Sequence, residues 1–585
     1  MNKISIYLSL AVLCFGIAAS AQSFNPRVEV TNAYQGKSVG NTKNSIDMNI
    51  PDSLTVFDYD FDYSVFDNPY KGSYEFSPYL IDMRPEAVSS DARRFYLRAG
   101  AGYSLHPELT AVLSPKLKTK NLSLQFYDNF RGYMGKYKTL KGYHMSSLEK
   151  YLVDNYENGS YSGYDMDNVL GAKVRYVGDK SVFSLEFTYR FLAVKDTVDK
   201  DYSPKDDHWN HMYNEGAIAL NVASKPYSDS KFVYDVDIKG RMGENDITFD
   251  AMGFAVGNTE VNGKVALGMK LGDHSLIGVD LGTDMGFYNR LLSAYVMNVY
   301  AIPRYKWSNG RFNADLGAQV AYIFGKDNTK NTIAPMHKTE SQIIYPDVSL
   351  SYRLLDKGLT VYARATGGND INQYSKLMDR NHFFSTVYLM SYTPTPLMDN
   401  SVTKLDASLG FKGQIGGYLQ FDIFGGYADT DSYLMDAIYQ TSRTNPLNLM
   451  GSIDYVGLKR IYADANLQWL SDHIEAGAHF RYTHAEPYKS DNFYLTLPRF
   501  AADGYITYNW SKRIYVGVNA DFCSERSTLY VIPSYIDLGA MAEFRVNNKF
   551  SVWLKGGNLL NRTIQRIPLH AEQWLNITGG ITLNL

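Results

Sequence analysis

The residues of this chain that could hold a metal ion are gathered in one acidic stretch, DTVDKDYSPKDDHWNHMYN, at positions 196–214. Its carboxylates would suit calcium, and His208 and His211 would suit a transition metal. The spacing matches neither an EF-hand loop nor a zinc motif. We therefore interpret the stretch as a solvated surface loop, and we predict no metal site and no cofactor.

Catalysis is the second chemistry to weigh. The chain has 11 histidines, which are scattered: His479 and His484 flank the end of a predicted strand, His382 lies in a predicted loop, and His570 precedes the last strand. A nucleophile needs a base within hydrogen-bond reach. No HExxH or GxSxG motif brings a nucleophile to any of these histidines. The sequence thus predicts no catalytic residue and no enzyme.

Charged residues alternate with apolar residues in several segments, among them VFSLEFTYRF (182–191), KFVYDVDIKG (231–240), RIYADANLQW (460–469) and KRIYVGVNADF (512–522). Successive side chains of a strand point to opposite faces, so each segment has an apolar face and a wet face. The wet faces carry Glu186, Arg190, Asp235, Asp237, Lys239, Asp464 and Asp521. If the strands enclose a pore, these residues line its lumen and tune which charge passes.

The length of the alternating segments indicates what positions them. A soluble sandwich, propeller or solenoid also alternates, but its strands are mostly ~5–6 residues long, whereas these segments run to ~9–12 residues, enough to cross a bilayer at a tilt. The pattern recurs about 22 times from near Arg94 to the final WLNITGGITLNL. We predict an all-β protein, a transmembrane antiparallel β-barrel whose last strand closes on its first and leaves no edge in lipid.

Turn signals predict short connections at 177–181, 271–275, 307–311, 355–359, 510–513 and 546–549. Longer connections are predicted at 135–168, 194–214, 325–345, 368–402, 429–448 and 486–499. In barrels of this kind the short turns face the periplasm and the long loops face outward. The barrel itself is predicted over residues 93–585.

The first residues resemble a secretory signal peptide, predicted at 1–21. Lys3 precedes an apolar stretch, and Ala19-Ser20-Ala21 has the small-x-small pattern of a signal-peptidase site. Cys14 raises the alternative of a lipoprotein, but Leu13 stands where a lipobox needs a small residue. We expect export to the outer membrane of a Gram-negative cell, with outer-membrane lipid around the barrel.

Residues 22–92 form an acidic, aromatic segment with 11 acids and 5 bases, centred on FDYDFDY at 57–63. Such a composition does not build its own core. The segment is expected to dock against the barrel mouth or lumen, or to bind a periplasmic or outer-membrane protein partner; the alternative is a mobile tether. Nucleic acid is not an expected partner, because the net charge is −3 and the basic residues form no patch.

The end of the chain, KFSVWLKGGNLLNRTIQRIPLHAEQWLNITGGITLNL, resembles the closing two strands of TonB-dependent receptors of Bacteroidota type. The resemblance rests on the turn Gly557–Asn561 and on a last strand with a glycine. Gly580, Leu583 and Leu585 are similar to the signal that the barrel-assembly machinery reads, although the family usually ends on an aromatic residue. Members of the family carry a plug domain of well over a hundred residues, whereas only residues 22–92 are available here. The resemblance therefore implies a barrel without a complete plug.

Two functions follow as expectations. The barrel acts in passive or partner-gated solute transport across the outer membrane, with the charged wet-face residues lining its lumen. Alternatively it transports nothing, and it is a membrane-held scaffold or an accessory component of an outer-membrane protein complex.

Overall fold

The structure is a computed structural model that describes residues 94–585, except 104, 120, 139–159, 198–207, 226–229, 250–251, 254, 273, 329–342, 356–357, 384–398, 441–448, 489–495, 528–530 and 569. The predicted signal peptide (1–21), the acidic segment (22–92) and most of the acidic stretch at 196–214 lie outside the described residues. No helix in the described part of the chain is long and apolar enough to cross a membrane.

Twenty-two of the described strands make up one barrel. They are β1 (Phe95–Tyr103), β2 (Glu108–Leu113), β3 (Leu122–Lys138), β4 (Ser160–Val177), β5 (Ser181–Thr197), β6 (His208–Ser224), β7 (Phe232–Phe249), β9 (Val256–Leu271), β10 (Ser275–Arg290), β11 (Ala294–Ser308), β12 (Phe312–Asp327), β13 (Ile344–Leu355), β14 (Leu359–Ile371), β15 (Asn400–Ile415), β16 (Leu419–Gln440), β17 (Leu449–Leu470), β18 (Ile474–Pro487), β19 (Phe500–Trp510), β20 (Ile514–Cys523), β23 (Tyr535–Asn547), β24 (Phe550–Gly557) and β25 (Asn576–Asn584). The two-residue strands β8 (Met252–Gly253), β21 (Arg526–Ser527) and β22 (Val531–Ile532) lie in connections.

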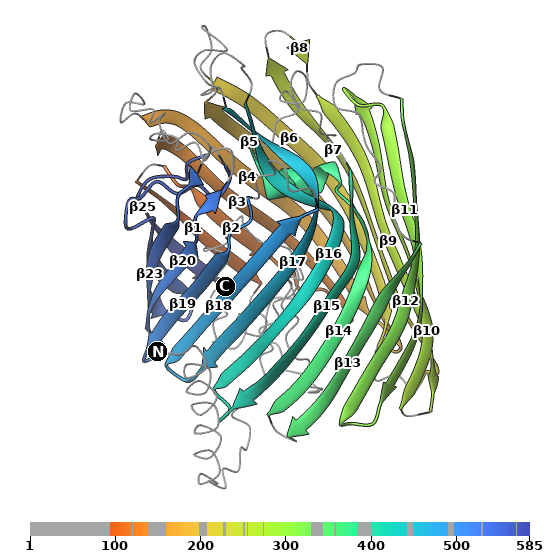
Figure 1. The fold of residues 1–585 in the computed structure, drawn as a ribbon. Helices are drawn as coiled ribbons and strands as arrows, with labels where there is room; N and C mark the ends of the chain where they lie inside the picture. The colour runs from red at the N-terminus through yellow and green to blue at the C-terminus, as the bar shows by residue number, and fades with distance from the viewer. Residues whose placement is uncertain are drawn as a thin grey trace, which may run out of the picture. The chain divides into compact units, whose positions relative to one another are not determined.

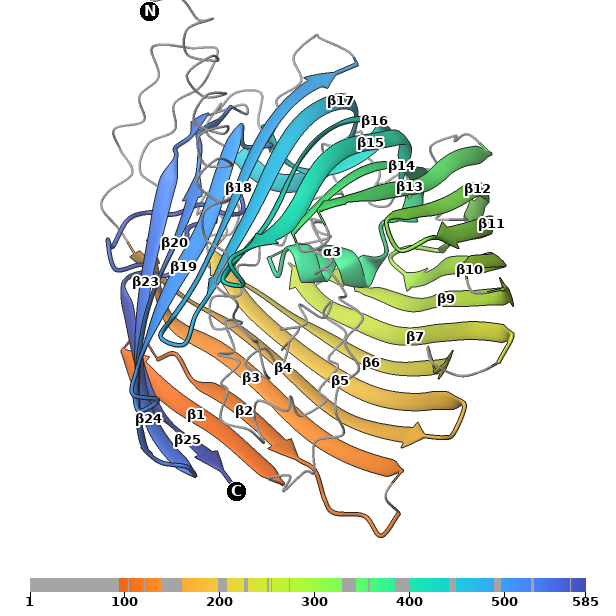
Figure 2. The ribbon, with the colours of Figure 1, turned by 90° about the horizontal axis from the view of Figure 1, so that it is seen from below.

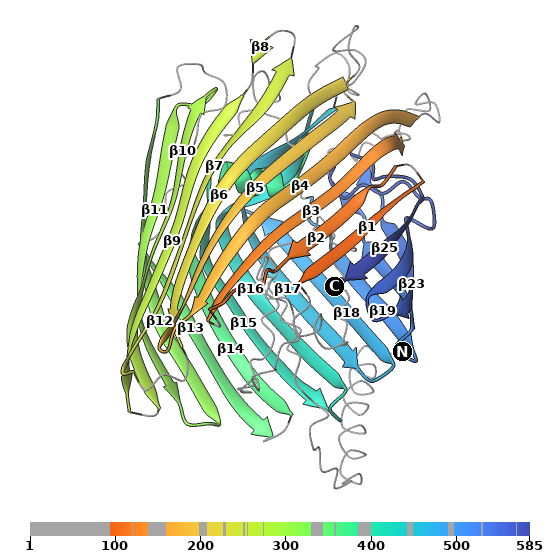
Figure 3. The same ribbon diagram turned by 180° about the vertical axis from the view of Figure 1, so that it is seen from behind.

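Each barrel strand pairs antiparallel with the next, and the ring closes between β25 and β1 (Figures 1 and 2). The closing register runs from Tyr96 opposite Asn584 to Tyr103 opposite Ile577, and the backbone N–H of Arg94 donates to the carbonyl of Leu585 at 2.6 Å. Figure 3 shows this closing pair from behind the view of Figure 1. The predicted fold class, a closed antiparallel barrel of about 22 strands, is confirmed.

The outer and inner faces of the wall differ as the alternation predicts. On β20, Val516 and Val518 are 46% and 41% exposed, whereas Tyr515 and Gly517, which alternate with them, are buried. The last strand has the same pattern, with Ile577 and Ile581 exposed and Thr578 and Thr582 buried. An outward apolar band over an inward polar wall is what hydrocarbon on one side and a polar lumen on the other require.

Replacing Val518 with Arg tests this assignment. Val518 lies in the middle of β20 on the outer face, so we expect the free energy of unfolding in lipid vesicles to fall by ~2–4 kcal/mol. Asn519→Arg is the matched control, because it introduces the same charge one position away on the inner face, and it should cost far less. Equal losses at the two positions would refute the membrane-facing assignment.

The abundant tyrosines have a use on the inner wall that composition alone did not predict. Tyr127 of β3 lies across Gly171 of β4, where a Cβ would come within 2.1 Å of the ring, and its hydroxyl donates to Glu186 of β5 at 2.5 Å. Tyr362 and Tyr462 cross glycines in the same way and donate to carboxylates one strand further on. Each of these tyrosines therefore ties three adjacent strands together.

All six predicted short turns are found between strands, at one end of the barrel. The strand ends that flank the predicted long connections are at the other end of the barrel, and here the predicted bounds were partly wrong. Residues 429–448 were predicted as a loop, but β16 continues to Gln440 and β17 begins at Leu449. The pairing shifts between Thr430 and Tyr433, and Met435 and Val456 beyond the shift are buried, so the alternation of exposed and buried residues is lost there.

Candidate functional site

A short helix, α3 (Tyr374–Arg380), lies inside the ring of strands (Figure 2). It belongs to the connection between β14 and β15, which the sequence had indicated only as a long loop. Leu377 and Met378 give the helix an apolar side, and these residues pack with buried side chains from β5, β6, β9–β12 and β17. A segment that contacts opposite sides of the wall must cross the mouth of the barrel.

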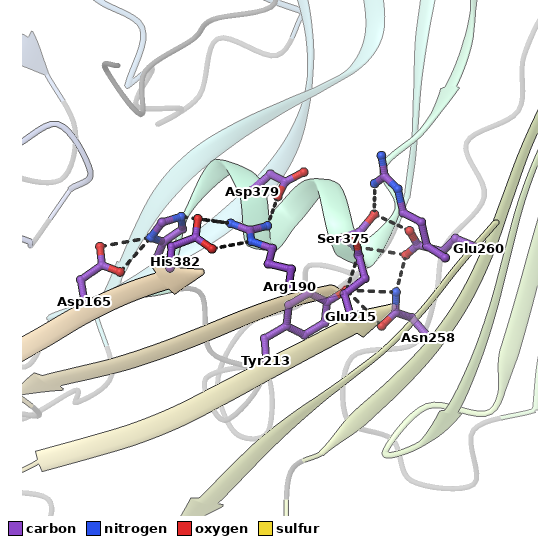
Figure 4. A network of polar contacts seen from close by, with 11 residues as sticks. Asp165, Arg190, Tyr213, Glu215, Asn258, Glu260, Ser375, Asp379 and His382 are labelled. Atoms are coloured by element: carbon purple, nitrogen blue, oxygen red, sulfur yellow. Dashed lines mark hydrogen bonds and ion pairs between the residues drawn. The ribbon is translucent and has the colours of Figure 1, made fainter. Parts of the chain in front are cut away.

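The first turn of α3 is fixed to the wall by Glu260 of β9 (Figure 4). The carboxylate of Glu260 is fully buried, and it accepts hydrogen bonds from the backbone N–H of Ser375 at 3.1 Å and from its hydroxyl. Asn258 donates to the same carboxylate at 3.0 Å, and Arg241 donates to the Ser375 hydroxyl at 2.6 Å. Next to it, the Tyr374 hydroxyl accepts a hydrogen bond from a wall asparagine on β7. Buried polar groups satisfied in this way favour one position of the helix.

Charged side chains of the wall hold the last turn of α3 and the residues after it (Figure 4). Arg190 of β5 contacts both carboxylate oxygens of Asp167 at 2.9 and 3.0 Å, and it also donates to Asp379 of α3. His382 Nδ1 lies 3.0 Å from the Asp165 carboxylate. Burial acts to lower the pKa of His382, but the carboxylates of Asp165 and Asp167 outweigh burial, and the pKa lies above its ordinary value.

The opposite side of α3 contacts the extended part of β16. Arg380 Nη2 donates to Asp436 at 3.1 Å, and Nη1 donates to the Leu434 carbonyl at 3.3 Å. Ile453 of β17 is buried in the same apolar cluster as α3. The β16–β17 extension beyond the register shift therefore serves as the second support of the helix.

A second connection, residues 558–575 between β24 and β25, also folds onto the inner wall. Its anchor is Arg566, which is 7% exposed and donates to Asp521 of β20 and, at 2.5 Å, to Asp537 of β23. The buried Arg526 donates to the carbonyl of Arg566 at 2.9 Å. The connection is thus held by charge-assisted hydrogen bonds to the wall.

The two connections meet at the mouth. The ring of Phe383, just after α3, stacks on the ring of His570 with centroids 4.7 Å apart and planes 11° apart. Tyr137 of β3 packs edge-on against Phe383 at 6.4 Å and bridges to Gln573. We call residues 372–383 and 558–575 together the mouth segments.

Of the seven charged residues predicted to line the lumen, two contact the mouth segments: Arg190 through Asp379 and His382, and Asp521 through Arg566. The other five contribute to the wall or face open space. The Glu186 carboxylate accepts a hydrogen bond from the Tyr127 hydroxyl and lies 3.7 Å from Lys173 Nζ. The Asp235 carboxylate accepts a hydrogen bond from the Asn221 side-chain amide at 3.1 Å.

Asp464 is almost fully buried, 3.0 Å from His479 Nε2 and 2.9 Å from Arg481 Nε. Asp237 is exposed and Lys239 is half-buried. The structure therefore does not bring these five residues together into one binding site.

The residues that anchor α3 were not predicted from the sequence. Glu260 is one of many polar residues on the inner faces, and His382 was only one of the scattered histidines. The usable signal was the segment YSKLMDR at 374–380, where two adjacent apolar residues interrupt the two-residue alternation. No group of three or more His, Cys, Asp or Glu that could hold a metal ion occurs among the residues that the structure describes.

The residues likened to an assembly signal lie in the closing strand. Gly580 pairs with Gly100 and Trp553, and a Cβ on Gly580 would come within 2.4 Å of the Trp553 ring, so a side chain here would collide with the indole. Leu583 pairs with Leu97 and Phe550, and Leu585 is exposed. Recognition of these residues by an assembly machinery stays a prediction.

A closed barrel of 22 strands with its own connections across the mouth defines a class, the large transmembrane β-barrels, whose lumen is too wide to be filled by wall side chains alone. Solved structures with a similar fold include the FrpB iron transporter from Neisseria meningitidis, with a TM-score of 0.61, 10% identity, and coverage of 85% of this chain and 81% of that chain. The copper transporter OprC has a TM-score of 0.59 and 11% identity over 84% of this chain and 80% of that chain.

The pyoverdine outer membrane receptor FpvA from Pseudomonas aeruginosa is similar as well, with a TM-score of 0.56 and 11% identity over 84% of this chain and 78% of that chain. With identities this low, the structural similarity shows a shared fold and nothing more. No protein-family model and no curated protein sequence matches the chain.

Proposed function

We propose that this chain is an outer-membrane transporter whose mouth segments act as a gate, closed at rest and opened by a partner or by the solute. The observation that carries the proposal is the meeting of the two mouth segments across a lumen that a barrel of this strand number would otherwise leave wide. Proteins that share the fold are transporters of copper or iron or a pyoverdine receptor, which supports a role in solute uptake.

In this proposal the charged inner-wall residues have two roles. Arg190 and Asp521 hold the gate, whereas the exposed Asp237 and the half-buried Lys239 meet the passing solute. The acidic segment 22–92 is the proposed contact for a periplasmic partner.

A second candidate is the non-transporting scaffold, and one observation favours it. Leu377 and Met378 at the centre of α3 are fully buried in an apolar cluster, which a segment that moves often would have to break and reform. A scaffold would keep its lumen closed under all conditions.

The Arg190–Asp379 contact allows a graded test. Asp379 is about half exposed, so its ion pair is worth only ~0.2–1 kcal/mol, and Asp379→Asn should raise the frequency of brief openings by a factor between about 1.4 and 5 in planar-bilayer recordings. Lys376→Gln is the control on the same helix, because the partner of Lys376 is Asp370 at the end of the adjoining strand β14 and not a residue of β5. Identical records for wild type and both variants would show that this ion pair does not hold the gate.

A further inference from the structure

The outer face of β3 carries one residue that does not suit lipid. Its outward positions from the short-turn end are Leu122, Leu124, Phe126, Asp128, Phe130, Gly132 and Met134, followed by Lys136 near the long-loop end. Asp128 is directly opposite Ala111 of β2 and Leu170 of β4, and Leu170 is 53% exposed on the outer face. Because directly paired residues share a face of the sheet, the Asp128 side chain also points outward.

Asp128 lies deep in the apolar band. It is the fourth outward residue of β3 from the short-turn end, with Phe126 on one side and Phe130 on the other. Phe126 is 43% exposed and Met134 is 38% exposed, so the band continues on both sides of Asp128. A phospholipid headgroup at either surface of the bilayer is therefore some distance away along the strand.

One oxygen of the carboxyl group has no hydrogen-bond partner among the described residues. Oδ1 of Asp128 is shielded from solvent, and no described residue donates a hydrogen bond to it. The outward neighbours Ala111 and Leu170 have no donor group. An ionisable side chain at this depth is costly and is retained where it meets a partner.

We propose that the outer face over β2, β3 and β4 binds a membrane-spanning segment of another protein that presents a lysine or arginine at mid-span to Asp128. The small side chain of Ala111 leaves room for close approach beside the carboxyl group, as small residues do in membrane interfaces. A lipid is a poorer match, since its charged groups stay at the bilayer surface.

A second copy of this chain does not meet the requirement. The outward residues of β2 (Leu109, Ala111 and Leu113) and those of β4 from Tyr164 to Tyr176 include no cation, and the outward Lys136 of β3 is eight positions from Asp128, toward the long-loop end of the strand. Packing of this face against itself would bring Asp128 to a second carboxyl group or to an uncharged residue. Charge complementarity thus points to a different, cationic segment.

The test uses the full mature chain in lipid vesicles and two synthetic transmembrane helices of leucine and alanine. One helix has a single central lysine and the other has leucine at that position. Energy transfer between a labelled barrel and each labelled helix should show about 3- to 30-fold tighter association of the lysine helix with wild type. Asp128→Leu should abolish this preference, and Asp128→Asn should reduce it.

Asp237→Leu serves as the matched control, because it removes an exposed carboxylate from the inner face. It should leave the preference for the lysine helix unchanged. Equal binding of the two helices by wild type, or a preference that survives in Asp128→Leu, would overturn the proposal. If Asp128→Leu does not insert, the Asp128→Asn comparison decides.

Discussion

Replacing residues 373–398 with two glycines should convert a silent barrel into an open pore. The ends of this segment are already adjacent, since Ile371 pairs with Asn400 and the Asn372 side chain donates to the Asp399 carbonyl at 2.8 Å. Two glycines suit a tight hairpin at this point, so β14 and β15 keep their register. The replacement removes α3 together with every contact that it makes across the mouth.

The expected result is a stable single-channel conductance in a planar bilayer at least as large as that of a 16-stranded porin, because the lumen here is wider. A variant in which a glycine–serine linker of equal length replaces the segment separates loss of the helix from shortening of the loop, and it should also conduct. Deletion of residues 22–88 in a further variant measures separately what the acidic segment contributes to closure.

Silence of the shortened barrel, from protein shown to be folded and inserted, would contradict the proposed gate. The lumen would then be closed by other parts of the chain, and the scaffold function would be favoured. The binding test at Asp128 is independent of this outcome, because it reads association at the outer face and does not need an open lumen.

Arg566→Met should lower the free energy of unfolding by ~3–5 kcal/mol. Arg566 is buried between Asp521 and Asp537, and it also donates to the Tyr535 hydroxyl at 3.1 Å. Methionine keeps a similar volume but leaves three partly buried carboxylates, those of Asp521, Asp537 and Glu572, without their cation. Urea titration in lipid vesicles, followed by tryptophan fluorescence, measures the loss.

The control for Arg566 removes the carboxylates as well. In the variant Arg566→Met, Asp521→Asn, Asp537→Asn, Glu572→Gln all three carboxylates that pair with Arg566 are neutral, so most of the stability should return, as it does when whole buried ion pairs are replaced. A loss below ~1 kcal/mol in the single variant would show that Arg566 does not anchor the 558–575 connection and that the ion pairs behave as surface pairs do.

The strands could be predicted from sequence because each one meets lipid on one face and a polar lumen on the other. Because of this, apolar and polar residues alternate along each strand, as in residues 512–522. The prediction was wrong where a strand no longer has one lipid-facing side. Beyond Thr430 both sides of β16 are covered, and the first part of the loop predicted at 429–448 is strand.

The mouth could not be predicted in the same way, because its contacts join distant parts of the chain. Arg190 and Asp379 are 189 positions apart, and Phe383 and His570 belong to different connections. No local period signals such a pair. Glu260 and Asp235 both occupy inward positions on neighbouring strands. Only Glu260 contacts α3, and this difference is visible only in the folded chain.

The tyrosines that lie over glycines have a consequence for assembly. A strand that slips by one residue exposes its wet face to lipid and is rejected, but a slip by two residues keeps every side chain on its proper face. Around Gly171, however, the neighbouring inward positions are Val169 and Lys173, whose Cβ atoms would occupy the space of the Tyr127 ring. These tyrosine–glycine pairs therefore disfavour a two-residue slip of the strands, which the apolar pattern alone would allow.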